Sequence, residues 1–265
     1  TFIFYKVFNL ILQSANGEFF MNENIQGMLQ VFLEEQKQKL DDLDNEIANI
    51  AEKLLDINWF LAPGLSCSDT KKWLNEGLEG ERLRKKIDCY YANHDYKNLY
   101  REFENIESIL KKDEYTQGYL KQVRIIKDNF IQNHDTFLIA INCIVSIIEF
   151  EYVNAIDELN TSNIMKYVNV EHLKNELKDR DDQEVIAISS IMALLKFLNF
   201  SEFEEGINHT LFTRHSLQHG RYNPDRLDIS DFIYCVCLLS SVCSLAETLK
   251  NEEFNSLKEE LRTMH

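Results

Sequence analysis

The sequence is poor in the residues that make turns. Its 265 residues include only 2 prolines and 8 glycines, too few for the frequent turns of a β-sandwich or β-barrel. It has no strand-length alternation of apolar and polar residues, no internal repeat and no glycine-rich phosphate loop. Leu, Ile, Lys, Glu and Asn are abundant instead. This composition predicts an all-α fold, a multi-helix bundle.

Positive charge is scarce as well. The chain has 28 Lys and Arg against 44 Asp and Glu, a formal net charge of −16. Such a surface repels nucleic acid at long range. The charge therefore excludes an extended nucleic-acid-binding groove and leaves room only for a small, local basic site.

The sequence also lacks the closely spaced cysteine pairs that bind metals, and it shows no targeting segment. The six cysteines, at positions 67, 89, 143, 235, 237 and 243, include no Cys-x-x-Cys pair. The last four lie in apolar runs, which predicts buried, reduced thiols and a cytoplasmic location. The apolar stretches 136–148 and 232–246 are expected to be too short to cross a bilayer. Residues 1–13 lack the basic region and cleavage site of a signal peptide.

Helical periodicity organises the chain. A long amphipathic helix is predicted over residues 22–57, with an apolar seam that includes Leu40 and Leu43. Further helices are predicted over 81–111, 113–133, 136–159, 184–200 and 231–250, with a break in the first, if any, at 93–95. Residues 136–159 are apolar nearly all round and are expected to be central. We predict an N-terminal helical region at 1–118 and a bundle at 119–265, which could also pack as one domain.

Residues 211–220, Leu-Phe-Thr-Arg-His-Ser-Leu-Gln-His-Gly, are the most informative stretch. They place Arg214 and His219 five positions apart, just ahead of Gly220. An imidazole can transfer a proton near neutral pH, and a guanidinium can hold a phosphate by two hydrogen bonds. With nine Arg and seven His in the chain, a given spacing arises by chance in roughly one of four such chains. Spacing alone therefore leaves open a helix end that merely carries polar residues.

The string Arg214-His215-x-x-x-His219-Gly220 resembles the signature of the HEPN superfamily of helical domains, an arginine, a polar residue and a histidine four to six positions after the arginine. Upstream, the stretch from His134 to Glu149 resembles the preceding helix of bacterial members. The resemblance implies a HEPN-like bundle in the C-terminal half. It also implies a metal-independent endoribonuclease of an anti-phage, abortive-infection or toxin system. Other members have lost the motif and only bind, so a non-catalytic binding or regulatory module is the alternative.

RNA cleavage of this type needs a base for the 2′-hydroxyl, an acid for the 5′-oxygen and stabilisation of the phosphorane. His219 suits the proton transfers, and Arg214 suits the phosphorane. His215 is either a second acid–base group or a residue that orients the others. Arg221 and Arg226 are candidates for holding substrate. Glu149 is an auxiliary candidate that either orients Arg214 or takes part in catalysis. No metal or cofactor is required.

Helix geometry separates Arg214 from His219. Five steps of about 100° leave them roughly 140° apart around an ideal helix. Gly220 indicates that the helix ends or bends there. The resemblance implies a homodimer whose two signature helices form one composite site. The expected partners are therefore RNA, a second copy and an inhibitory or triggering protein.

Two further alternatives stay open. His215 and His219 have a metal-ligand spacing that Asp225 or Asp228 could complete. A purely structural oligomerisation protein would leave Arg214 and His219 unexplained.

Overall fold

The structure, a computed structural model, describes residues 46–159, 174, 177–198 and 212–263. The chain divides into two units, 1–47 and 48–265. Of the helix predicted over 22–57, residues 46–57 are described and 46–56 are helical, while Leu40 and Leu43 lie outside the described residues. The boundary predicted between residues 118 and 119 falls inside the second unit.

The described part of the second unit consists of helices and turns without strands, so the all-α prediction is confirmed. Its longer helices are α3 (Cys67–Asn75), α4 (Gly80–Leu110), α5 (Gln117–Gln132), α6 (Phe137–Leu159), α9 (Asp182–Leu198), α10 (Arg214–Gln218), α11 (Ile229–Leu249) and α12 (Asn255–Thr263). Short 3-10 helices are η1 (Glu114–Thr116), η2 (His134–Thr136), η3 (Leu177–Asp179), η4 (Pro224–Arg226) and η5 (Glu252–Phe254).

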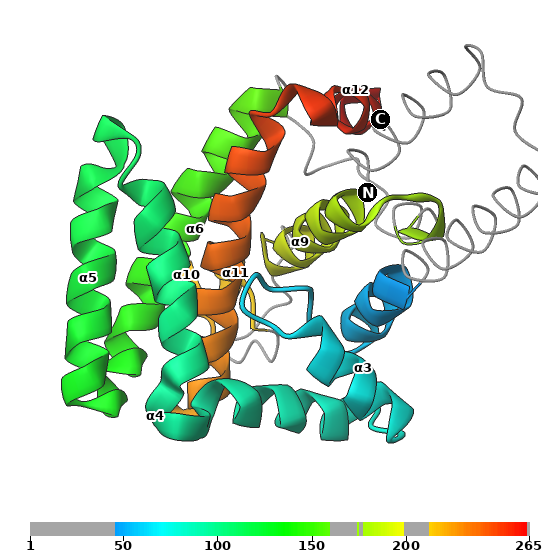
Figure 1. Ribbon diagram of the computed structural model, residues 1–265. Helices are drawn as coiled ribbons and strands as arrows, with labels where there is room; N and C mark the ends of the chain where they lie inside the picture. The colour runs from blue at the N-terminus through cyan, green and yellow to red at the C-terminus, as the bar shows by residue number, and fades with distance from the viewer. Residues whose placement is uncertain (1–45, 160–173, 175–176, 199–211, 264–265) are drawn as a thin grey trace, which may run out of the picture. The chain divides into compact units, whose positions relative to one another are not determined.

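Helix α11 forms the centre of this unit. It packs against α4, α6 and α9 (Figure 1), and residues 232–243 are all buried. Asp228 caps its N-terminus by accepting hydrogen bonds from the backbone N–H groups of Ser230 (2.8 Å) and Asp231 (3.1 Å). The thiols of Cys235, Cys237 and Cys243 are buried there, and burial raises their pKa well above the usual value.

Helix α6 is not central, and that prediction was wrong. One side packs on α11, while the other leaves Ile139 75% exposed and Val153 48% exposed. Cys143, predicted to be buried, is exposed on the same helix. The six cysteines all lie in the described residues and form no disulfide.

In the part of the chain that the structure describes, two helices are apolar enough over sufficient length to cross a membrane, contrary to the expectation that both stretches are too short. They are His134–Ala155, whose apolar window is 39% buried in this fold, and Ile229–Leu249, whose window is 78% buried. Both apolar segments extend several residues beyond the runs visible in the sequence. Core helices of soluble proteins pass the same test, so it identifies no span.

Helix α4 turns sharply in the middle, at the position where a break was expected. Asn93 leaves the helical region, and His94, Asp95 and Tyr96 have φ angles of 51°, 52° and 61°. The two halves therefore run in different directions (Figure 1), one beneath the loop 59–66 and one along α11. This loop carries Trp59 into the core, where its ring lies 5.4 Å from that of Tyr234.

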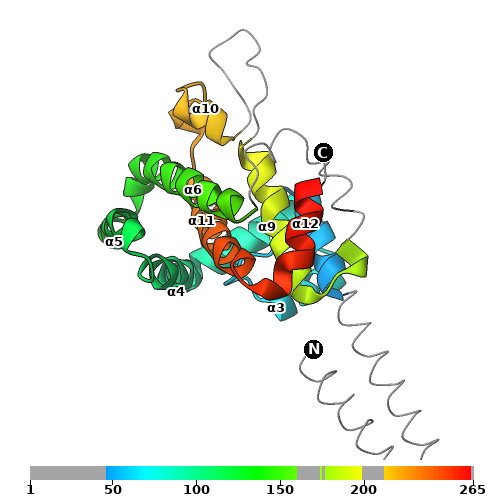
Figure 2. The same cartoon turned by 90° about the horizontal axis from the view of Figure 1, so that it is seen from above.

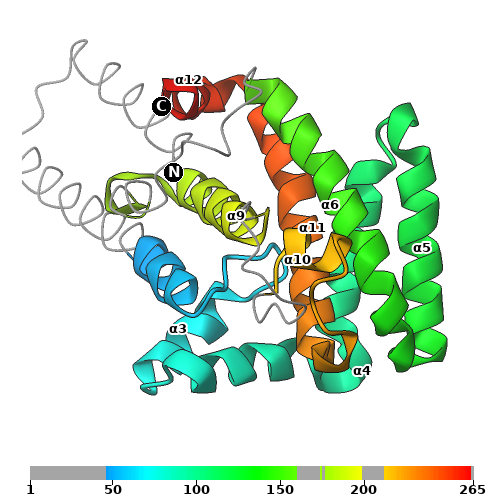
Figure 3. The ribbon, with the colours of Figure 1, turned by 180° about the vertical axis from the view of Figure 1, so that it is seen from behind.

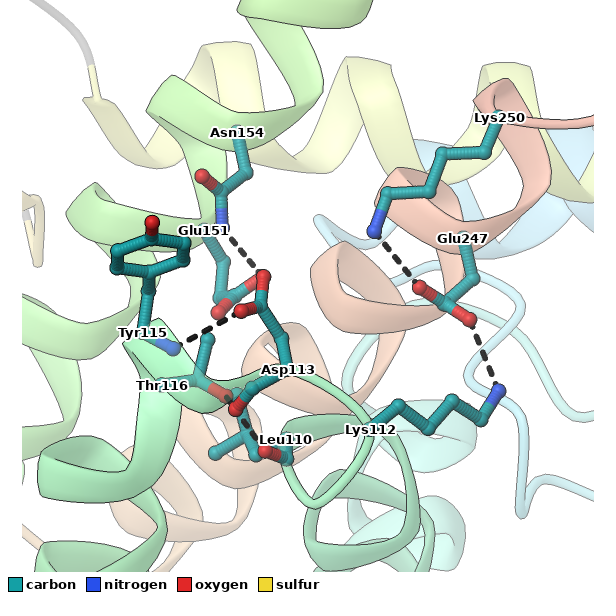
Figure 4. A network of polar contacts seen from close by, with 9 residues as sticks. All are labelled: Leu110, Lys112, Asp113, Tyr115, Thr116, Glu151, Asn154, Glu247 and Lys250. Atoms are coloured by element: carbon teal, nitrogen blue, oxygen red, sulfur yellow. Dashed lines mark hydrogen bonds and ion pairs between the residues drawn. The ribbon is translucent and has the colours of Figure 1, made fainter.

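A network of hydrogen bonds and ion pairs stabilises the turn between α4 and α5 (Figure 4). Asp113 accepts a hydrogen bond from the backbone N–H of Tyr115 at 2.9 Å, and the Thr116 hydroxyl donates to the carbonyl of Asp113 at 2.8 Å. On α11, Glu247 accepts from Lys112 and Lys250 at 2.8 and 2.9 Å. The network ties the ends of α4 and α11 together.

Candidate functional site

The signature residues lie on a very short helix whose two ends are both specified locally. Thr213 is the N-cap of α10: its hydroxyl accepts from the N–H of Ser216, and the Ser216 hydroxyl accepts from the N–H of Thr213. At the other end Gly220 has a φ of +64°. The N–H groups of Gly220 and Arg221 bond to the carbonyls of Leu217 (3.1 Å) and Ser216 (2.8 Å), a Schellman ending. The predicted stop at Gly220 is therefore confirmed.

Aromatic side chains on either side of α10 attach it to the bundle. The rings of Phe212 and Tyr222 meet edge to face at 5.5 Å. Phe212 also lies 5.8 Å from Phe197 of α9 and 6.4 Å from Tyr234 of α11. Helix α10 contacts α6 and α9 and lies at the periphery of the bundle (Figures 2 and 3). The signature is thus a surface feature anchored at its flanks.

Arg214 is turned toward α6. Its guanidinium Nη2 donates to Oε1 of Glu149, while Oε2 of the same carboxylate accepts from Gln218 Nε2 at 3.1 Å. The Arg214 side chain is 17% exposed and that of Glu149 is 38% exposed. The two ends of α10 therefore share one carboxylate. The contact agrees with an orienting role for Glu149 and gives no evidence of a catalytic one.

The two signature histidines meet each other. Their ring centroids lie 4.6 Å apart, with the ring planes at 66°. The two residues stand four positions apart and so share one face of α10, of which His219 is the C-cap. His219 is exposed and His215 is half-buried. Arg214 and His219 were predicted to point in different directions around the helix. In the structure Arg214 faces Glu149, and His219 faces His215.

Arg221 and Arg226 both lie on the surface after α10, with exposed side chains. Acidic residues lie in the same loop: burial, followed by the carboxylates of Asp231 and Asp228, raises the pKa of Tyr222, and Arg226 opposes this rise. The segment therefore carries both signs of charge. The segment from Arg214 to Arg226 is therefore not a purely basic patch.

The alternative metal site is not assembled. Among the described residues, no group of three or more His, Cys, Asp or Glu side chains is arranged to hold a metal ion. Asp225 and Asp228, the proposed additional ligands, instead belong to turns: Asp225 donates its N–H to Asn223 Oδ1, and Asp228 caps α11.

Sequence reasoning missed two features of the site. One is Gln218, which shares Glu149 with Arg214. The other is the Thr213–Ser216 capping box, for which Thr-Arg-His-Ser at the start of the signature was a readable signal.

No family model, curated protein or solved structure matches the chain. The functional conclusion therefore rests on the residues themselves.

Proposed function

We propose that this protein is a HEPN-type, metal-independent endoribonuclease. The observation that supports it best is the pairing of His215 with His219, 4.6 Å apart, beside an arginine held by Glu149. Two imidazoles in contact can supply an acid and a base, and the guanidinium supplies positive charge for a phosphate. A structural helix end has no need for this combination.

The reaction follows from these groups. One imidazole removes the proton of the RNA 2′-hydroxyl, whose oxygen attacks the adjacent phosphorus. The second imidazole donates a proton to the 5′-oxygen as its bond to phosphorus breaks. Arg214 meets the extra negative charge of the five-coordinate phosphorane. The products carry a 2′,3′-cyclic phosphate and a 5′-hydroxyl, and Arg221 and Arg226 hold neighbouring phosphates.

A homodimer completes the proposed site. The outward side of α6 carries an uncharged α6 face, defined by Leu138, Ile139, Asn142, Cys143, Ser146 and Val153, all exposed. At about 100° per residue, Glu149 falls between Leu138 and Asn142 within this arc, where its charge is paired with Arg214. Because the chain carries a net charge of −16, an uncharged face is where two copies can approach without repulsion. Pairing there would bring the two α10 helices together.

The cellular role is part of the same proposal. The resemblance to nuclease-type HEPN domains supports a cytoplasmic toxin or anti-phage effector, held by an inhibitory partner or released by a trigger. The absence of disulfides among the six cysteines is compatible with a reducing compartment.

Cleavage of single-stranded RNA in EDTA by the purified protein tests the chemistry. We expect His219→Ala and Arg214→Ala each to reduce cleavage by at least about 10²-fold, the usual contribution of an acid–base or electrostatic group. The matched control is His94→Asn, at the exposed turn of α4, where Asn tolerates the positive φ. Full activity in both signature variants, with unchanged circular dichroism, would end the ribonuclease proposal.

Light scattering tests the dimer. We expect Ile139→Asp to weaken self-association by at least about tenfold, because a carboxylate would be buried in the interface. Ile125→Asp on α5, where the native side chain is 49% exposed, is the matched control. An active wild-type protein that is monomeric at its working concentration would overturn the composite site.

A non-catalytic binding module is the second candidate. The uncharged α6 face favours it, since such a face also suits a different protein partner. RNA cleavage that is lost in His219→Ala would exclude this alternative.

A further inference from the structure

The turn in the middle of α4 is made without the residues that usually make turns. Gly80, its first residue, is the only glycine of this helix, and the helix has no proline. His94, Asp95 and Tyr96 have positive φ, and their ψ angles of 53°, 46° and 26° place all three in the left-handed helical conformation. This conformation is unfavourable for L-residues and occurs mostly in single residues, and a bulky residue such as Tyr96 is a clear outlier in it. The turn is therefore a strained segment.

Contacts on either side hold the turn in place. The Asn98 side chain donates across it to the carbonyl of Tyr90 at 2.9 Å. The ring of Tyr96 lies 4.7 Å from that of His134, at the end of α5. The two residues before Tyr96 are exposed, so core packing does not require their conformation. The strain is thus balanced by few interactions.

The turn separates an arm from the body of the unit. The arm is residues 48–92, and the body is the described residues that follow the turn. Buried contacts join the two: the Leu61 N–H donates to Ser189 Oγ at 3.2 Å, and the Trp59 ring lies 5.4 Å from that of Tyr234. Because these contacts join groups on opposite sides of the turn, the arm of one copy can make them with the body of a second copy.

The sequence of the turn also allows an unbroken helix. Proline would exclude it and glycine would disfavour it, and the segment Asn93–Tyr96 contains neither. With these residues in the right-handed conformation, α4 becomes one straight helix of about 46 Å. The arm then extends away from its own body and uncovers Trp59, which is 0% exposed in this fold. A second copy is the partner that fits, because each uncovered arm is complementary to the body of any other copy.

We propose that this chain forms an arm-exchanged dimer, in which α4 is continuous and each arm packs on the body of the other copy. Exchange restores the contacts between arm and body and removes the strain of two turns, one in each copy. It is opposed by the lost freedom of two separate chains, so it increases with protein concentration. The exchange uses neither the uncharged α6 face nor the signature residues, and it does not depend on nuclease activity.

Two substitutions of Asp95 test the turn, each made in the Ile139→Asp chain so that the uncharged α6 face does not pair. Asp95→Gly and Asp95→Ala remove the same exposed carboxylate, but glycine adopts the left-handed conformation freely and alanine favours the helix. The samples are equilibrated at millimolar concentration in mild urea and measured by light scattering. We expect the dimer association constant of Asp95→Ala to exceed that of Asp95→Gly by at least about 10²-fold, because two turns change in each dimer.

The chain with the native Asp95 should lie between the two variants. If Asp95→Ala does not fold, the native residue takes its place in the comparison, with an expected excess over Asp95→Gly of at least about tenfold. Equal association constants, or chains that stay monomeric throughout, would overturn the proposal.

Carbodiimide coupling of the dimer fraction shows which copy supplies the arm. This reagent joins ion-paired carboxylates and amines directly as amides. Oδ1 of Asp56 in the arm lies 2.7 Å from Nζ of Lys174 in the body, and Oε2 of Glu52 lies 3.8 Å from Nζ of Lys178. In an arm-exchanged dimer these pairs join two chains, so denaturing electrophoresis should show covalent dimers that disappear in the control Lys174→Gln/Lys178→Gln. Coupling within single chains alone, or covalent dimers that persist in the control, would show that the arms are not exchanged.

Discussion

Helices α6 and α11 look alike in the sequence and differ in the fold. Their apolar windows have mean hydropathies of 1.7 and 1.8, yet they are 39% and 78% buried. Helix α11 packs against α4, α6 and α9, so its neighbours surround it. Helix α6 has α11 on one side and the uncharged α6 face on the other. Hydropathy therefore measures what a helix could bury, and the number of neighbours decides what it does bury.

The two helices also carry different kinds of residue, those of α11 bearing on stability and those of α6 on the candidate site. Helix α11 contains Ser240 and Ser241, which are buried, and three buried cysteines. Helix α6 carries Glu149, which is half-buried and in contact with Arg214. We infer that α11 mainly holds the unit together, while α6 supports the signature and offers a surface for assembly.

The largest expected effect comes from truncating the same side chain on both helices. Ile233 of α11 is 0% exposed and Ile139 of α6 is 75% exposed. Ile233→Ala should lower the free energy of unfolding by about 2–5 kcal/mol, because it removes a packed side chain and leaves a cavity. Ile139→Ala should change it by less than about 0.5 kcal/mol in the monomer. Urea denaturation of both variants measures the contrast, and equal losses would refute the difference between the helices.

The sequence predicted part of this arrangement. Within the described residues, the helix positions, the break in α4 at Asn93 and the stop at Gly220 follow from local signals, and they are confirmed. The neighbours of α6 could not be predicted, because they depend on which long-range contacts form. The contact between His215 and His219 agrees with their spacing, because residues four apart lie on the same face of a helix.

Helix α11 also has a partly buried carboxyl group, Asp231, in its first turn. Burial raises its pKa from 3.8 to about 6. The hydrogen bond from the Asp228 N–H and the charge of Arg84 oppose this rise, and the carboxylates of Asp228 and Asp88 add to it. The unfolded chain loses this proton near pH 4 and the folded chain only near pH 6. Stability is therefore lost as pH rises through this window.

Asp231→Asn should recover that stability above pH 6, because the amide oxygen can still accept from the Asp228 N–H, a bond of 3.2 Å in the native protein. We expect a gain of about 2 kcal/mol at pH 7.5, after allowing for the lost charge at a helix N-terminus, and little gain below pH 4. Thermal unfolding across pH 3.5–8 measures it. A gain that is the same at every pH would show that the charge of Asp231 is not responsible.

The smallest effects concern two carboxylates of α6 that lie two residues apart and so on different sides of the helix. Glu149 pairs with Arg214 near the surface, whereas Glu151 is 3% exposed, and burial raises its pKa (Figure 4). Glu149→Gln should cost less than about 1 kcal/mol, the usual value of a partly exposed ion pair. Glu151→Gln should instead stabilise the protein at neutral pH, because a group with a raised pKa loses stability as pH rises through it.

Activity separates the two carboxylates further. If Glu149 orients Arg214 as proposed, Glu149→Gln should reduce the single-turnover rate of RNA cleavage by about tenfold, a larger effect than its loss of stability predicts. Glu151→Gln, on the buried side of the same helix, should leave that rate unchanged, and its gain in Tm should disappear below the ordinary glutamate pKa of 4.5. Single-turnover cleavage and thermal unfolding of both variants, each at pH 4 and pH 7, provide the measurement. Equal rates for the two variants would show that the contact between Glu149 and Arg214 serves packing alone.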